Sequence, residues 1–167
     1  RTLAWLGLDW DAGPIVQSED LRPYRDAMTK LAAAGLVYPC ELTRAQIESA
    51  ASAPQEGAHE TPFPAGLRPS DIRPRRFDVE ETNWRLVVPP GAVEFADDFA
   101  GPQRHDPAES VGDFIVWTRR GQPSYQLAVV VDDHRQGVTR IVRGDDLLDS
   151  AARQLRLYGM LGYPRPP

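Results

Sequence analysis

Residues 124–148 read SYQLAVVVDDHRQGVTRIVRGDDLL, and the spacing of their apolar positions decides the fold. The valines at 129–131 favour a strand. The same stretch nevertheless has the i, i+3, i+4, i+7 spacing of an amphipathic helix, at Leu127, Val130, Val131 and His134. Gly137 supplies a helix stop, so we predict a helix up to this glycine, a strand over 138–143 and a second helix over 146–161.

Tyr125 and Arg143 flank this predicted helix and strand. A helix of about 11 residues runs about 17 Å away from Tyr125, and a strand of about five residues returns by the same distance. In a parallel sheet both residues would lie at the carboxyl edge, where α/β folds bind ligands. Arginine can hold a carboxylate with two parallel hydrogen bonds, and a tyrosine hydroxyl can orient a small ligand. The pair therefore suits a small anion such as an amino acid.

A purely structural role for the same two residues is the alternative. Arg143 would then form an ion pair with Asp145 or Asp146. Tyr125 would cover the core. The spacing of the residues does not by itself separate this interpretation from a ligand site.

Length and composition favour one soluble domain. The chain has 167 residues, of which 41% are hydrophobic and 26% are charged, and its net charge is -5. This charge argues against a general polyanion-binding protein, although Arg73, Arg75 and Arg76 could form a local basic face. The single cysteine excludes an intrachain disulfide and fits a reducing cytosol, so we expect a cytoplasmic protein. No stretch is long and apolar enough to span a membrane, so we expect no membrane partner.

Two further helices are predicted in the first third of the chain. One begins near Ser18, carries Glu19 and Asp20 in its first turn and stops at Gly35. Its apolar face consists of Leu21, Tyr24, Met28 and Leu31. The other helix begins at Thr43, where Thr-x-x-Gln forms a capping box.

The middle of the chain predicts a loop followed by strands. Residues 53–76 are rich in Pro, Gly, Ala and charge and have no sustained period, which indicates a long loop or insertion. Two short strands are predicted around the Pro-Pro-Gly turn that begins at Pro89. Another strand is predicted over 113–117, and residues 119–122 form its turn.

Neighbouring acidic residues and scattered histidines offer weaker candidates for a site. Asp132 and Asp133 are adjacent on the predicted helix and point in different directions, so they do not share a ligand, and we expect a solvated helix end. The three histidines do not have the spacing of metal ligands, either to one another or to Cys40. We interpret them as surface residues: His59, His105 and His134. No Gly-rich phosphate loop of a common pattern is present.

The run SYQLAVVVDDHRQGVTRIVRGDDLLDSAARQLRLYGMLG resembles the central part of class I glutamyl-tRNA synthetases. It is most similar to the branch that attaches glutamate to the queuosine of tRNA(Asp). The details that indicate this branch are Gln126-Leu127, Gln136-Gly137-Val138-Thr139 and Asp146-Leu147-Leu148. Standard glutamyl-tRNA synthetases usually have Asn-Phe, Met-Gly-Ile-Thr and a His within the third motif. Further matches, in order, are WLGLDWDAGP, AAAGLVYPCELTR, RLVVPPGAVEFADDFAG and VGDFIVW.

The resemblance implies an α/β fold, a partial Rossmann-like class I aminoacyl-tRNA synthetase catalytic domain with an inserted acceptor-stem-binding α+β region. Residues 1–39 and 121–167 would belong to the catalytic domain, and 40–120 to the insertion. The implied reaction is ATP-dependent activation of L-glutamate, with Mg²⁺, followed by transfer to the queuosine of tRNA(Asp). We expect a monomer.

The resemblance also implies roles for individual residues. Tyr125 and Arg143 match the glutamate-binding tyrosine and arginine of the family, at the right separation. Asp146 and Leu147 lie where relatives approach the ATP. No catalytic residue is expected within this chain.

Two departures from the family pattern matter. The branch typically holds a structural zinc with a Cys-x-Cys pair and a later Tyr-x-x-x-Cys, but the corresponding positions here read Cys40-Glu41-Leu42 and Phe63-Pro64-Ala65-Gly66-Leu67. Cys40 alone cannot build tetrahedral zinc, so we predict no zinc at this site. The His-x-Gly-His and Lys-Met-Ser-Lys-Ser signatures would lie before and after this chain, so we expect an internal fragment that does not activate glutamate alone.

Two rival interpretations stay open. The protein could be a standard glutamyl-tRNA synthetase, which would need a C-terminal anticodon-binding domain. It could instead be a non-catalytic tRNA-binding module that has lost the chemistry of its relatives. An intact His-x-Gly-His motif upstream would count against the second interpretation.

Overall fold

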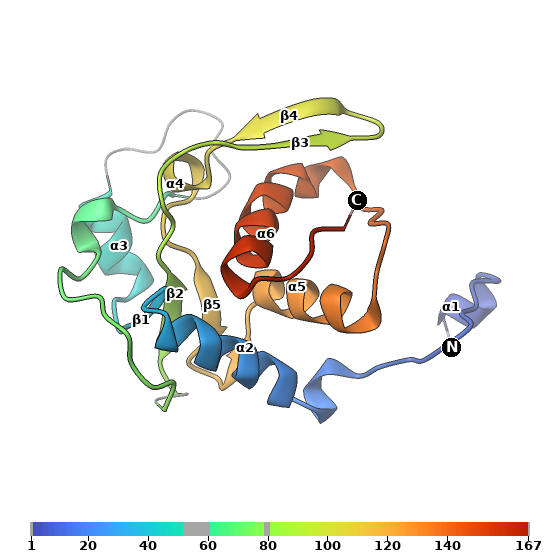
Figure 1. The fold of residues 1–167 in the computed structure, drawn as a ribbon, viewed down its shortest axis with the longest axis horizontal. Coiled ribbons are helices and arrows are strands. Elements are labelled where there is room, and N and C mark those ends of the chain that lie inside the picture. The colour runs from blue at the N-terminus through green and yellow to red at the C-terminus, as the bar shows by residue number, and fades with distance from the viewer. Residues whose placement is uncertain (1, 52–60, 79–80, 167) are drawn as a thin grey trace.

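An antiparallel sheet lies at the centre of the structure, a computed structural model that describes residues 2–51, 61–78 and 81–166 (Figure 1). Its strands occur in the order β1-β2-β5-β6, and each pairing is antiparallel. These strands are β1 (Val37–Cys40), β2 (Asn83–Leu86), β5 (Ile115–Thr118) and β6 (Gln122–Pro123). A separate hairpin pairs β3 (Val93–Asp97) with β4 (Gly101–His105).

Helices cover the two faces of this sheet (Figure 1). The α-helices are α1 (Thr2–Trp5), α2 (Arg22–Ala33), α3 (Arg44–Ala50), α4 (Pro107–Ser110), α5 (Tyr125–Gln136) and α6 (Leu148–Leu161). The described residues also form short 3₁₀ turns, which are η1 (Gln17–Glu19), η2 (Ala65–Leu67) and η3 (Asp145–Leu147). Helices α2, α5 and α6 pack against one another on one side of the sheet, and α3 lies on the other side (Figure 1). Within the described part of the chain, no helix has the length and apolarity needed to cross a bilayer.

The alternation of side chains along the strands divides the apolar residues between two cores. Val37 of β1 belongs to the larger core beneath α2, α5 and α6, whereas Tyr38 and Cys40 belong to a smaller one beside α3. Trp84 and Trp117 are both almost fully buried in the larger core. The period-two pattern therefore lets a single sheet support α2, α5 and α6 on one face and α3 on the other (Figure 1).

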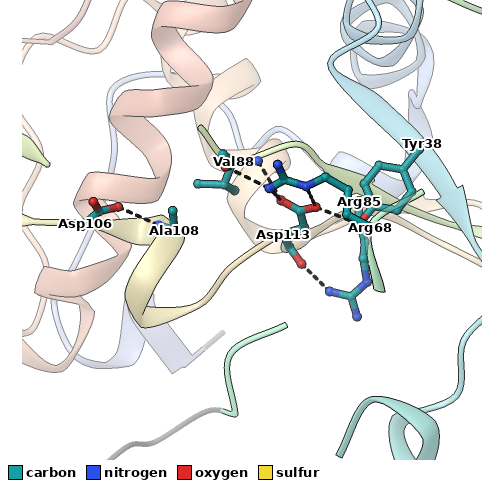
Figure 2. A network of polar contacts seen from close by, with 7 residues as sticks. All are labelled: Tyr38, Arg68, Arg85, Val88, Asp106, Ala108 and Asp113. Atoms are coloured by element: carbon teal, nitrogen blue, oxygen red, sulfur yellow. Dashed lines mark hydrogen bonds and ion pairs between the residues drawn. The ribbon is translucent and has the colours of Figure 1, made fainter. Parts of the chain in front are cut away.

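A buried carboxylate joins the loops around the sheet (Figure 2). Asp113, just before β5, is 1% exposed. Its two carboxylate oxygens accept hydrogen bonds from Arg68 Nη2 at 2.6 Å and Nε at 2.7 Å, Tyr38 Oη at 2.8 Å and the Val88 backbone N–H at 2.8 Å. Arg85 also donates to the backbone carbonyl of Asp113. The Asp113 carboxylate thus connects segments that are far apart in the sequence.

The hydrogen bonds to Asp113 affect the pKa values of the two side chains that donate them, Tyr38 and Arg68. Burial raises the pKa of the Tyr38 hydroxyl above its ordinary range, and the Asp113 carboxylate raises it further. The hydrogen bond to Asp113 raises the pKa of the Arg68 guanidinium. Both neighbours therefore remain protonated donors at physiological pH, and the Asp113 carboxylate stays satisfied.

Most predicted helices are confirmed. The capping box at Thr43 is present, since its side chain accepts from the backbone of Gln46 and the Gln46 side chain accepts from the backbone of Thr43. Helix α5 ends where Gly137 adopts the left-handed conformation with φ of 66°. Tyr24, Met28 and Leu31 of the predicted apolar face are buried on α2, and the last predicted helix forms as α6 and ends at Leu161.

The predicted start of the α2 helix is wrong by four residues. The helix begins at Arg22, not Ser18, so Glu19 and Asp20 lie before it. Pro23 occupies the first turn, where its missing N–H costs nothing. Asp20 instead accepts from the backbone and side chain of Arg22, and this hydrogen bond lowers the pKa of Asp20.

The predicted strand over 138–143 is wrong, and the condition of a parallel sheet is not met among the described residues. Residues 138–143 have no regular secondary structure, and every strand pairing that the structure describes is antiparallel. The valine and isoleucine of this segment favour a strand locally, but a strand also needs a neighbour with which to form hydrogen bonds. Val142 is 91% exposed instead.

The middle of the chain agrees in part with expectation. Strands β2, β3 and β5 form where predicted, but β2 and β3 belong to different sheets, and β4 and α4 were not predicted. In the described part of the predicted loop, residues 61–76, only the η2 turn is regular; residues 53–60 lie outside the described residues. The division at residues 39 and 120 stays a prediction.

Replacing Asp113 with Ala should lower the free energy of unfolding by about 3 kcal/mol or more, because Arg68 and the Tyr38 hydroxyl lose their buried acceptor. Urea unfolding measures this change. Glu48→Ala is the control, since it removes only the exposed Arg44–Glu48 pair and should cost less than about 0.5 kcal/mol. Equal losses in the two variants would contradict a central role for Asp113.

Candidate functional site

Tyr125 is the first residue of α5, and the sheet fixes its place. Its neighbour Ser124 donates its backbone N–H to the Val116 carbonyl at 2.8 Å and caps the helix by accepting from the Leu127 N–H at 3.5 Å. The Tyr125 side chain is 53% exposed. The first turn of α5 therefore presents this ring at the surface, and Tyr125 does not cover the core.

Arg143 lies on the irregular segment between α5 and α6. Its Nη1 donates a hydrogen bond of 2.6 Å to Oε1 of Gln154, and the structure shows no ion pair with Asp145 or Asp146. Gln154 comes from α6 and is only 3% exposed. The guanidinium of Arg143 is thus anchored to a buried amide.

A chain of buried side chains continues from Gln154 to α5. Gln154 Nε2 donates to Gln126 Oε1 at 2.9 Å, and Gln126 Nε2 donates to Ser150 Oγ at 3.1 Å. Gln126 is 9% exposed and follows Tyr125 directly. Arg143 is therefore tied, through one intervening side chain, to the helical turn that carries Tyr125.

Asp132 and Asp133 lie near the other end of α5 and face different partners. Asp132 is buried and accepts from the Tyr24 hydroxyl at 2.9 Å and from Gln17 Nε2 at 2.6 Å. Asp133 accepts from the Tyr158 hydroxyl at 3.3 Å. The prediction that they do not share a ligand agrees with these contacts, but the expectation of a solvated helix end is wrong for Asp132, because α2 and η1 cover it.

Burial dominates the ionisation of this region. It raises the pKa of Tyr24 to about 12, and the Asp132 carboxylate adds to the shift. Burial likewise raises the pKa of Asp133, against the hydrogen bond from Tyr158 and the positive charge of Arg143. The charge of Arg143 therefore acts on α5 as well as on its hydrogen-bond partner.

The residues expected near ATP lie just after Arg143. Asp146 and Leu147 belong to the η3 turn that leads into α6. Asp146 is exposed, and Leu147 is partly buried. Their proximity to ATP stays a prediction.

Cys40 ends β1 and lies in the smaller core. It packs with Tyr38 and Phe63, and the partly buried neighbours of this core are also apolar: Leu42, Ile47, Leu67, Ile72 and Val87. Thiolate and imidazole ligands for a tetrahedral metal are not supplied by these neighbours. Among the described residues, no three His, Cys, Asp or Glu side chains converge as a metal site would require. The described neighbours of Cys40 do not fit a zinc site, and its zinc-free state stays a prediction.

The described histidines have structural partners. His105 Nδ1 lies 3.1 Å from Asp149 Oδ1, and the His134 ring stacks on Tyr163 with centroids 3.8 Å apart. His59 lies outside the described residues.

Comparison with known proteins places this arrangement in a family. A family model described as tRNA synthetases class I (E and Q), catalytic domain, matches residues 1–167. The chain is 46% identical over 176 residues to the Glutamyl-Q tRNA(Asp) synthetase of Symbiobacterium thermophilum, covering 98% of this chain and 54% of that protein. It is also 46% identical to the protein of the same name from Geobacter sulfurreducens, covering 99% and 52%.

The fold is similar to that of solved structures. The glutamate-tRNA synthetase from Elizabethkingia anophelis aligns with a TM-score of 0.77 at 22% identity, over 98% of this chain and 37% of that chain. The chain thus belongs to the class I tRNA synthetases of the E and Q type, a family of ligases, and matches their catalytic domain. Within this family it is similar to proteins named Glutamyl-Q tRNA(Asp) synthetase, and it spans about half of their length. The predicted fold class is confirmed.

Three polar residues beside Arg143 were missed as part of the site. Gln126 was noted as a branch detail, but Ser150 and Gln154 were not singled out. Each lies on the buried face of its helix, where polar side chains need a partner. Polar residues at apolar positions of α5 and α6 were the signal that could have indicated them.

Replacing Asp133 with Asn should make stability less dependent on pH. Its pKa is raised above the ordinary 3.8, so the folded state binds this proton more tightly than the unfolded state does. The stability contributed by the protonated group is present below pH 3.8 and is lost as the pH rises through the raised pKa. Asn cannot ionise, so the variant should be more stable than the wild type at neutral pH.

Urea unfolding over a series of pH values measures this difference. The difference should disappear well below pH 3.8, where the Asp133 carboxyl of the wild type is protonated in both the folded and the unfolded state. Asp98→Asn, on the exposed hairpin turn, is the control. A constant difference between Asp133→Asn and the wild type at all pH values would contradict the raised pKa.

Proposed function

We propose that the complete protein activates L-glutamate with ATP and transfers the glutamyl group to the queuosine of tRNA(Asp). Membership of the class I tRNA synthetases and similarity to proteins named Glutamyl-Q tRNA(Asp) synthetase support this proposal. One observation supports a binding site at particular residues: hydrogen bonds through Gln154 hold the Arg143 guanidinium beside the turn of α5 that exposes Tyr125.

In this proposal Arg143 and Tyr125 bind the amino acid. The guanidinium carries five N–H donors in a planar fork. When Nη1 of Arg143 donates one hydrogen bond to Gln154, the Nε and Nη2 donors can still bind a carboxylate. The exposed Tyr125 supplies a hydroxyl for orientation and a ring that excludes water. Holding glutamate in one orientation lowers the entropic cost of its reaction with ATP.

The parts of the reaction that involve ATP are assigned more broadly. Asp146 and Leu147 are proposed to lie close to the nucleotide, because η3 follows Arg143 directly. Mg²⁺ is proposed to accompany ATP and to neutralise charge on its phosphates. The residues that stabilise the transition state are proposed to lie outside this chain, which spans about half of its relatives.

Replacing Arg143 with Ala in the complete protein should weaken glutamate binding by more than about 2 kcal/mol, because a charged hydrogen-bonded contact is lost. The measurement is the KM for L-glutamate in the exchange of pyrophosphate into ATP. Arg140→Ala, on the same segment and exposed, is the matched control and should retain the wild-type KM. An unchanged KM and kcat in Arg143→Ala would remove this residue from the site.

The identity of the acceptor is tested separately with three tRNA preparations. Transfer of labelled glutamate should occur to tRNA(Asp) that contains queuosine and not to the same tRNA lacking queuosine or to tRNA(Glu). Transfer to tRNA(Glu) would support a standard glutamyl-tRNA synthetase. Absence of any glutamate-dependent pyrophosphate exchange in the complete protein would support a non-catalytic module.

A further inference from the structure

We propose that Gln154 and Gln126 are positioning residues that set the guanidinium of Arg143 for its ligand. This inference rests on the proposed glutamate site. Neither glutamine needs to touch the amino acid. Both act through the buried chain of hydrogen bonds that runs from Arg143 to Ser150.

The segment that carries Arg143 does not fix this side chain by itself. Residues 138–143 have no regular secondary structure, and Val142 before Arg143 is 91% exposed. An arginine side chain has many rotamers, so ordering it costs conformational entropy. An external contact must therefore select one orientation, and Gln154 Oε1, at 2.6 Å from Nη1, supplies that contact.

The chemistry of the chain fixes the direction of each hydrogen bond. Arginine has only donors, so the oxygen of Gln154 must face Arg143. The amide nitrogen of Gln154 then needs an acceptor and finds Gln126 Oε1 at 2.9 Å. The nitrogen of Gln126 in turn donates to Ser150 Oγ at 3.1 Å. Neither amide can be reversed without leaving two donors, or two acceptors, facing each other.

Burial makes this order costly to disturb. Gln154, Ser150 and Gln126 are 3%, 4% and 9% exposed, so water cannot readily replace a lost partner. Arg153 Nη2 also donates to Ser150 Oγ at 3.2 Å, which holds the far end of the chain on α6. The packing of α5 against α6 thus determines where the Arg143 guanidinium lies.

This arrangement also fixes the direction of the guanidinium toward a carboxylate. With one N–H of Nη1 directed at Gln154, the Nε–Nη2 edge is held in one orientation, and this edge can give two parallel hydrogen bonds to a carboxylate. Removing the Gln154 oxygen would release the fork to rotate. The charge of Arg143 would remain, but its orientation toward the ligand would not.

The test is a double-mutant cycle in the complete protein, with L-glutamate as the varied substrate in pyrophosphate exchange. Gln154→Met retains the length of the side chain and removes the acceptor. It should raise the KM for L-glutamate by about tenfold and leave the KM for ATP unchanged, as expected for a lost hydrogen bond to a charged group. In an Arg143→Ala background the same substitution should change the KM for L-glutamate no further, because Gln154 acts through Arg143.

Two more variants keep the test decisive. Gln126→Met removes the oxygen that accepts a hydrogen bond from the Gln154 amide. It should also raise the KM for L-glutamate, and again only when Arg143 is present. This variant replaces Gln154→Met if Gln154→Met does not fold. Tyr24→Phe is the matched control. It removes a buried hydrogen bond from Tyr24 to Asp132 of α5, which is not part of the hydrogen-bond chain from Arg143 to Ser150, and it should retain the wild-type KM.

The outcomes separate the two proposals. A wild-type KM in Gln154→Met, beside a raised KM in Arg143→Ala, would overturn the positioning role alone. A rise that persists in the Arg143→Ala background would also overturn it, since the effect would then be general loss of structure. A wild-type KM in Arg143→Ala would overturn the glutamate site and the positioning role together.

Discussion

The buried carboxylate of Asp113 is the constraint on which the rest of the structure depends. It satisfies donors from β1, from the segment after η2 and from the backbone after β2 (Figure 2). These donors are taken out of water when the two sides of the sheet close, so each one needs an acceptor at the same place. A single side chain supplies that acceptor, and it stands two residues before β5.

The position of the candidate site follows from that strand. Strand β5 receives the Ser124 N–H on its Val116 carbonyl, which places the start of α5 and therefore Tyr125. Helix α5 packs on α6, and the glutamines between these helices hold Arg143. The two residues proposed to bind glutamate are thus placed by different means, one by the end of a strand and the other by a buried polar contact. Neither is placed by the carboxyl edge of a parallel sheet, since every described strand pairing is antiparallel.

Local patterns explain which parts of the fold could be predicted from the sequence. Helix α5 was predicted correctly because its apolar spacing and Gly137 lie within a few turns of each other. Residues 138–143 were predicted wrongly because a strand depends on a neighbour that its own residues do not reveal. The contacts of Asp113 and Gln154 join residues far apart in the chain, and only the packing of elements brings them together. Asp132 was expected in solvent for the same reason, since Tyr24 covers it from another helix.

A crystal structure of the complete protein with L-glutamate would test the proposed site most directly. We expect a carboxylate of glutamate on the Nε–Nη2 edge of Arg143, the Tyr125 side chain against the ligand, and the hydrogen bond from Nη1 to Gln154 retained. Glutamate bound beyond the reach of Arg143, or an Arg143 side chain that leaves Gln154 to bind it, would contradict the proposed arrangement.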